Sequence, residues 1–255
     1  MRGNRSPLTM VDHRNEWKGA RVNPQADSMH FAVFPLGAFQ ANGYILGCPQ
    51  TRQALVIDPG ADAEQLAAWL SEHELVPAIY FHTHGHIDHV GATRALKERF
   101  GGEIWLHPDD RELYARADEI ARAWGLTLAP PLPIDRFLSD GQELRWGEQT
   151  GRVVHTPGHS PGGVCLRVAG ERLPAVGGSA GADWVFTGDT LFQGSIGRTD
   201  LPGGSLPALL RSIRERLLSL PDATVVAPGH GPLTTIGAER TDNPFLRGDL
   251  PRGDL

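Results

Sequence analysis

The sequence is poor in cysteine and contains no long apolar run. Only two of its 255 residues are cysteines, Cys48 and Cys165, too few for a framework of disulfides. No stretch approaches the roughly 20 apolar residues of a membrane-spanning helix. The N-terminal residues also lack the apolar segment of a secretory signal. We therefore expect a cytoplasmic protein that does not act at a membrane.

An excess of basic charge is also missing. The chain has 24 Lys and Arg against 30 Asp and Glu, which gives a formal net charge of −6. Because nucleic-acid binding requires a basic face that neutralises phosphates, we expect no nucleic-acid partner. The oligomeric state cannot be derived from these figures.

Glycine, proline and histidine are abundant instead. Glycine (31) and proline (20) make up a fifth of the chain, against about 12% in average proteins. The 40% of hydrophobic residues is enough for a large core. The sequence thus indicates a loop-rich globular protein, and its 11 histidines call for an explanation.

Short apolar runs closed by turn residues alternate with amphipathic segments from His30 onward. Strands are expected at 31–34, 43–46, 54–58, 77–81, 103–107, 136–138, 143–146, 152–155, 163–168, 183–189 and 223–231. Helices are expected at 62–73, with Asp62 as N-cap, and at 92–100, 108–125 and 205–220. This order favours a layered α/β sandwich over a purely parallel sheet. We expect a disordered leader (1–28), one folded domain (29–246) and a flexible tail (247–255).

A dense cluster of metal-ligand side chains follows the expected strand at 77–81. Three imidazoles and a carboxylate occupy six positions: His84, His86, Asp88 and His89. Imidazole nitrogens and carboxylate oxygens are ligands for divalent Zn, Fe and Mn. Ligands two residues apart on a loop can face one centre, while Asp88 and His89 are offset enough to face a second.

Three further strands each end in one side chain of the same kind. His159 follows a Pro-Gly turn after 152–155, Asp189 ends the run at 183–189, and His230 lies on a Pro-Gly turn after the last strand. Functional residues concentrate on loops held by a rigid scaffold, and glycine there permits a close approach of the backbone. The pattern indicates one site built from several strand ends.

The HxHxDH motif at 84–89, followed by His159, Asp189 and His230, resembles the metallo-β-lactamase superfamily. The strings THGHIDHVGA, HTPGHSPGG, FTGDTLFQGSIGRTDLPGG and APGHGPLTTIGAERTDNPFL are similar to short, bacterial glyoxalase II-like (hydroxyacylglutathione hydrolase-like) enzymes. The resemblance covers about residues 30–246. It implies a four-layer αββα sandwich with metals in a cleft at one edge of two sheets.

The resemblance also implies a ligand set and a reaction. One metal would be held by His84, His86 and His159, a second by Asp88, His89 and His230, and Asp189 would bridge them. Zinc is the expected metal, and Fe and Mn accept the same ligands. A hydroxide bridging the metals would attack a thioester, S-D-lactoylglutathione or a related acylglutathione. The catalytic carboxylates would be Asp88 and Asp189; we treat Asp88 as a ligand rather than a base, and a thiolate leaving group needs no general acid.

Three questions stay open at this point. Arg198 takes the place of a lysine that contacts glutathione in glyoxalase II; it is a candidate for substrate binding, or it pairs with Asp200. Asp58 is either a turn former or a partner for a metal-binding histidine. The roughly 25 residues after His230 show no amphipathic helix of the kind that helps full-length glyoxalase II hold glutathione. Either other groups bind glutathione, or the substrate is a different small ester or thioester.

A second family gives an alternative activity. The string Gly197-Arg198-Thr199-Asp200 also resembles persulfide dioxygenases, which use one non-haem iron held by two histidines and one aspartate. His84, His159 and Asp189 match those ligands. The PGHG string at 228–231 favours the hydrolase.

Overall fold

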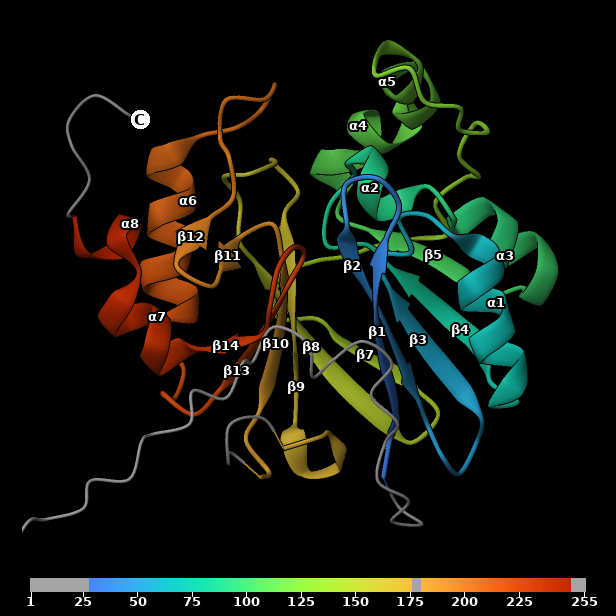
Figure 1. The fold of residues 1–255 in the computed structure, drawn as a ribbon, viewed down its shortest axis with the longest axis horizontal. Helices are drawn as coiled ribbons and strands as arrows, with labels where there is room; N and C mark the ends of the chain where they lie inside the picture. The colour runs from blue at the N-terminus through green and yellow to red at the C-terminus, as the bar shows by residue number, and fades with distance from the viewer. Residues whose placement is uncertain (1–27, 176–179, 249–255) are drawn as a thin grey trace, which may run out of the picture.

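Two six-stranded sheets pack face to face, and helices cover the outer face of each (Figure 1). The computed structural model describes residues 28–175 and 180–248. The expected leader (apart from Ser28) and the tail from Asp249 lie outside these residues. The predicted four-layer αββα sandwich is confirmed.

The first sheet comes from the N-terminal half of the chain and has the order β1-β2-β3-β4-β5-β6. β1 to β3 pair antiparallel and β3 to β6 pair parallel. The strands are β1 (His30–Leu36), β2 (Ala41–Gly47), β3 (Gln53–Ile57), β4 (Val76–Phe81), β5 (Glu103–Leu106) and β6 (Arg136–Phe137). The helices of this half are α1 (Ala63–Glu72), α2 (Ile87–Val90), α3 (Thr93–Phe100), η1 (Pro108–Asp110), α4 (Arg111–Ala115) and α5 (Ala117–Ala123).

The second sheet has the order β14-β13-β10-β9-β8-β7. Its strands are β7 (Glu143–Trp146), β8 (Gln149–His155), β9 (Val164–Val168), β10 (Trp184–Gly188), β13 (Val225–Pro228) and β14 (Thr234–Thr235). A small hairpin pairs β11 (Leu191–Phe192) with β12 (Ser195–Ile196). The helical elements are η2 (Gly170–Arg172), α6 (Leu206–Ser212), the π-helical η3 (Ile213–Leu217), α7 (Ile236–Asp242) and α8 (Pro244–Arg247).

The main hydrophobic core lies between the two sheets. Phe31 and Tyr44 of the first sheet meet Trp184 and Phe186 of the second edge to face, with ring centroids 5.0 and 5.1 Å apart. Such aromatic pairs contribute about 0.5–1.5 kcal/mol each beyond the burial of their area. The packed sheets form the rigid scaffold from which the loops extend.

Four strands deliver their C-terminal ends to one edge of the sandwich, the upper edge in Figure 1. β10 and β13 are parallel, and β8 runs in the same direction because β9 pairs antiparallel with both β8 and β10. In the first sheet, β4 ends at the same edge. The residues that follow β4, β8, β10 and β13 therefore lie together.

Two expected helices differ in the structure. The segment 108–125 is broken into η1, α4 and α5, with Arg116 at φ −103° and ψ 14° between the last two. Its first turn is 3₁₀ because His107 accepts the N–H of Asp109 and the side chain of Asp110 is fully buried in loop contacts. The helix expected at 205–220 forms, but its second half is the π-helical η3.

Asp62 occupies the N-cap position of α1, as expected, but its side chain does not cap the helix. Two short helices, α7 and α8, lie after His230, where no amphipathic helix is expected. Asp62 has a left-handed φ of 52°, and its carboxylate accepts the N–H of Gly37 at 2.8 Å instead of capping α1. α7 and α8 form because Thr235 and Asn243 cap them, accepting N–H groups of Ala238 and Phe245. Every helix within 28–175 and 180–248 is too short or too polar to cross a bilayer.

Candidate metal centre

The upper edge of the sandwich brings all seven ligand-type residues together. They come from the loop after β4, from α2, and from the turns after β8, β10 and β13. These residues are His84, His86, Asp88, His89, His159, Asp189 and His230.

The first group consists of three imidazoles. His159 Nε2 lies 2.8 Å from His86 Nδ1 and 3.2 Å from His84 Nε2. His84 and His159 are buried, and His86 is half-buried. The spacing allows all three nitrogens to contact one ion.

The second group consists of Asp88, His89 and His230. Asp88 Oδ2 lies 3.3 Å from His230 Nε2 and 3.6 Å from His89 Nε2. Asp189 lies between the two groups: its Oδ1 is 3.4 Å from His89 Nε2, and its Oδ2 is 3.6 Å from both His159 Nε2 and His230 Nε2.

Hydrogen bonds on the outer nitrogens fix the tautomers of three imidazoles. His159 Nδ1 donates to the carbonyl of Arg198 at 2.8 Å, and His89 Nδ1 donates to Asp58 Oδ2 at 3.0 Å. Thr83 Oγ1 donates its proton to a hydrogen bond with Asp58, so it accepts a hydrogen bond from His84 Nδ1 at 3.0 Å. In the neutral form of these three histidines, the Nε2 atoms therefore carry no proton and present lone pairs to the centre.

The electrostatics of the two groups differ. Burial, together with the neighbouring histidines, lowers the pKa of His84 and lowers that of His86 to about 3. Burial also lowers the pKa of His89, but the carboxylates of Asp88, Asp189 and Asp58 outweigh it and raise this pKa to about 10. The second group thus attracts positive charge, and a divalent cation can take the place of the proton.

The His230 turn is held from the opposite sheet. Asn42 on β2 donates through Nδ2 to the carbonyls of Pro228 and Gly231, and Tyr44 Oη donates to Pro228 at 2.7 Å. Gly229 permits a close approach at this turn, since a Cβ there would lie 2.2 Å from Asp189 Oδ1. The position of His230 therefore depends on packing between the sheets.

The donor set fits two divalent cations. His89 Nε2 and Asp189 Oδ1 are buried and have no hydrogen-bond partner, although they point into the cluster. Buried polar atoms rarely remain without a partner, and a cation would supply one for both. The chemistry of the donors, imidazole nitrogen and carboxylate oxygen, suits Zn, Fe or Mn.

Arg198 lies beside the first group but is not part of it. Its backbone carbonyl accepts a hydrogen bond from His159 Nδ1, while its exposed guanidinium donates two hydrogen bonds of 2.7 Å to Asp200. The Arg198 guanidinium holds the pKa of Asp200 at about 2. Of the two roles considered for Arg198, the structure shows the ion pair with Asp200.

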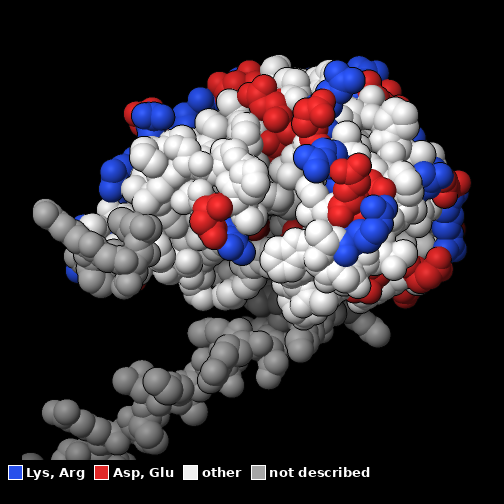
Figure 2. All heavy atoms as spheres, turned by 90° about the horizontal axis from the view of Figure 1, so that it is seen from above, with Lys and Arg blue, Asp and Glu red and all other residues white. Residues whose placement is uncertain are grey.

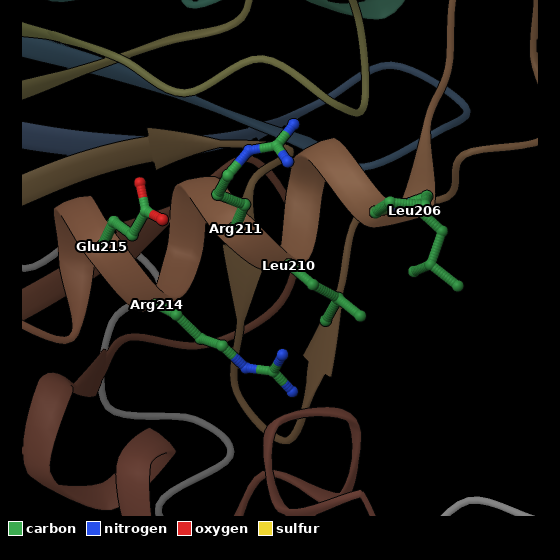
Figure 3. Close-up of a pocket in the computed structure, with 6 residues that line it drawn as sticks. Leu206, Leu210, Arg211, Arg214 and Glu215 are labelled. Carbon is green, nitrogen blue, oxygen red and sulfur yellow. The ribbon is translucent and has the colours of Figure 1, made fainter.

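Two of the hollows on the described part of the surface differ in their lining. One, of about 380 Å³, is lined by Asp88 together with apolar residues that include Leu36, Phe39 and Leu128. The other, of about 450 Å³, lies along α6 and η3, where Leu206, Leu210 and Arg214 project outward from the helix (Figure 3). The first contains one of the seven candidate ligands, Asp88, whereas the second contains none of them.

The sequence interpretation missed two residues that support the centre. Asn42 gives no signal beyond being a polar residue next to an expected strand. Asp110 lies in the segment expected as a helix, yet its carboxylate contacts the loops of His84 and His159. Asp58, left open between two roles, contacts His89 and Thr83.

Comparisons with known proteins agree with this geometry. The metallo-β-lactamase superfamily pattern matches residues 36–230. The hydroxyacylglutathione hydrolase GloC of Haemophilus influenzae is 39% identical over 229 residues, covering 86% of this chain and 98% of GloC.

Two solved structures share the fold over most of both chains. The protein TTHA1623 in a di-iron-bound form is 45% identical, with a TM-score of 0.70, covering 83% of this chain and 98% of its own. The B3 metallo-β-lactamase BLEG-1 is 40% identical, with a TM-score of 0.74, covering 85% and 99%. The chain therefore belongs to the metallo-β-lactamase superfamily and is a metallo-hydrolase of that superfamily.

Proposed function

We propose that this protein is a dinuclear metal-dependent hydrolase that cleaves a small thioester, S-D-lactoylglutathione or a related acylglutathione. The observation that carries the proposal is the position of Asp189 between two facing groups of ligands. GloC, named as a hydroxyacylglutathione hydrolase, supports the substrate class. We expect zinc, with iron as the main rival because TTHA1623 binds two irons.

The two groups divide the work of such a reaction. Two divalent cations bound here would lower the pKa of a bound water toward neutrality and polarise the substrate carbonyl. His84, His86 and His159 would hold one cation, and Asp88, His89 and His230 the other. Asp189, in contact with both groups, keeps them at a fixed separation. The thiolate leaves without protonation, so no general acid is required of the protein.

A mononuclear iron centre, as in the alternative persulfide dioxygenase, would engage only three of the seven candidate ligands. Iron held by His84, His159 and Asp189 would leave His89 Nε2 buried without a partner. It would also leave Asp88 Oδ2 with only the imidazoles of His89 and His230 as partners. These costs favour the dinuclear hydrolase.

The surface around the centre supports a small-molecule substrate. Basic and acidic side chains alternate on the face seen in Figure 2, so its visible part has no continuous basic stripe for a nucleic acid. We propose that Arg198 binds a carboxylate of the substrate in exchange for Asp200, because an ion pair this exposed to solvent is weak. Cys48 and Cys165 are both buried and unpaired, which supports a reducing compartment such as the cytoplasm.

The test combines metal analysis with a substrate panel. Purified protein should contain two metal ions per chain and hydrolyse S-D-lactoylglutathione, whereas His89→Ala should retain about one ion and lose most turnover. His73→Ala serves as the matched control, because His73 stacks on Trp69 in α1 and contacts no ligand-type residue. One iron per chain with oxygen uptake on glutathione persulfide would overturn the proposal. If the protein turned over only a β-lactam or a different thioester, the proposed substrate would be wrong, while the proposed dinuclear centre would stand.

A further inference from the structure

Asp110 is a fully buried carboxylate that belongs to none of the metal-ligand motifs. It ends η1, directly after β5, and its exposed fraction is 0%. Burying a carboxylate is costly unless its oxygens are hydrogen-bonded. The donors that compensate for this cost show what the residue does.

Three donors from two different loops converge on this side chain. Oδ2 accepts the N–H of Gly85 at 3.0 Å and the hydroxyl of Ser160 at 2.7 Å. Oδ1 accepts the N–H of Gly162 at 2.6 Å. Gly85 lies between His84 and His86, and Ser160 directly follows His159.

We propose that Asp110 is a positioning residue that sets the distance between the His84–His86 loop and the His159 loop. It would thereby determine how tightly the group formed by His84, His86 and His159 holds its metal ion. The inference concerns metal retention alone, so it does not depend on which substrate the enzyme cleaves.

The packing around Asp110 leaves little room for another spacing. A Cβ on Gly162 would lie 2.8 Å from Asp110 Oδ1, so only glycine allows the His159 loop to approach this closely. The bases of the two loops are joined separately, because Val164 donates its N–H to the Thr83 carbonyl at 2.8 Å. Asp110 therefore acts near the ligands, where a small displacement changes the nitrogen–nitrogen distances most.

A carboxylate is the suitable group for this contact. It offers acceptors on both oxygens, and hydrogen bonds to a charged acceptor are about twice as strong as neutral ones. An asparagine would present an NH₂ group to the Gly85 or the Gly162 N–H. Either the His84–His86 loop would lose its bond from Gly85, or the His159 loop would lose one of its two bonds, while the side-chain volume stayed nearly the same.

The decisive measurement is competition between the zinc-loaded protein and a chromophoric chelator. In Asp110→Asn we expect one of the two ions to bind about 10–100-fold more weakly, the range for residues that orient ligands, with the other unchanged. Glu239→Gln is the matched control: Glu239 is buried and accepts from Gly194, Thr234 and Asn243, away from both loops. It should lower the melting temperature without weakening either ion.

A milder variant covers the case in which Asp110→Asn does not fold. Ser160→Ala removes one donor and keeps both backbone contacts, so it should weaken the same single ion by a few-fold while the metal-free protein stays folded. Unchanged affinity in both variants would overturn the proposal. Equal weakening of both ions, in step with the loss in melting temperature of the metal-free protein, would also overturn it, since that result indicates a purely structural role. Loss of thioester hydrolysis is not part of the readout.

Discussion

Replacing Asp58 by asparagine should weaken metal binding without removing a candidate ligand, because Asp58 orients His89 and, through Thr83, His84. The Asp58 carboxylate is buried and accepts three hydrogen bonds: from Thr83 N at 2.8 Å, from Thr83 Oγ1 at 2.5 Å and from His89 Nδ1 at 3.0 Å. An amide has one acceptor oxygen where the carboxylate has two. At least one of the three donors will therefore face an NH₂ group.

The size of the effect depends on which way the amide turns. If the amide oxygen accepts from Thr83 N, the NH₂ group faces His89 Nδ1 and Thr83 Oγ1 and donates to both. The protons of His89 and His84 then move to their Nε2 atoms, which need free lone pairs to bind a metal. If it turns the other way, a buried N–H is left without an acceptor, at about 1–3 kcal/mol. We expect about 10–100-fold weaker metal binding, and a melting temperature of the metal-free protein lower by about 2–12 °C.

Chelator competition and calorimetry on the same preparations measure both quantities. Asp140→Asn provides the control, because Asp140 lies at the same edge and accepts from His155 N and Arg216 but contacts no ligand-type residue. That variant should bind both ions like the wild type. If Asp58→Asn also kept wild-type affinity for both ions, the tautomer assignment of His84 and His89 would be refuted.

Three further substitutions test other parts of the site. Asp189→Ala should reduce the metal content from two ions to about one and lower kcat by at least about 10²–10³-fold. Full turnover by this variant would show that Asp189 is not a metal ligand. Gly229→Ala places a Cβ 2.2 Å from Asp189 Oδ1, and the overpacking, about 1–3 kcal/mol, should lower the melting temperature measured by calorimetry. Arg198→Ala should raise KM several-fold with kcat nearly unchanged, because its backbone carbonyl still orients His159. A fall in kcat at constant KM would contradict a binding role for Arg198.

The sequence predicted the αββα fold and pointed to residues that the structure brings together, because both signals are local. His84, His86, Asp88 and His89 lie within six positions, and the apolar runs before His159, Asp189 and His230 mark strand ends directly. The alternation of strands and helices, read with the family resemblance, then favoured the sandwich. The metal ligation itself stays a prediction until the ions are counted.

The contacts that hold these loops could not be predicted in the same way. The donors of Asp110 at Gly85 and Gly162 lie 25 and 52 residues away, and Asn42 contacts Pro228 across 186 residues. A periodic pattern over 108–125 suggests one helix, but the contacts of Asp110 and the turn at Arg116 override it. Tertiary hydrogen bonds leave no mark within a short window of sequence.

The division of the ligand-type residues between the two sheets has a consequence for biosynthesis. The segment 84–89 belongs to the half of the domain made first, while His159, Asp189 and His230 are synthesised later. A nascent chain therefore exposes four candidate ligands long before the remaining three have been synthesised. Because imidazole and carboxylate ligands accept several divalent ions, the metals available when the sheets dock would contribute to which ions the proposed centre takes up.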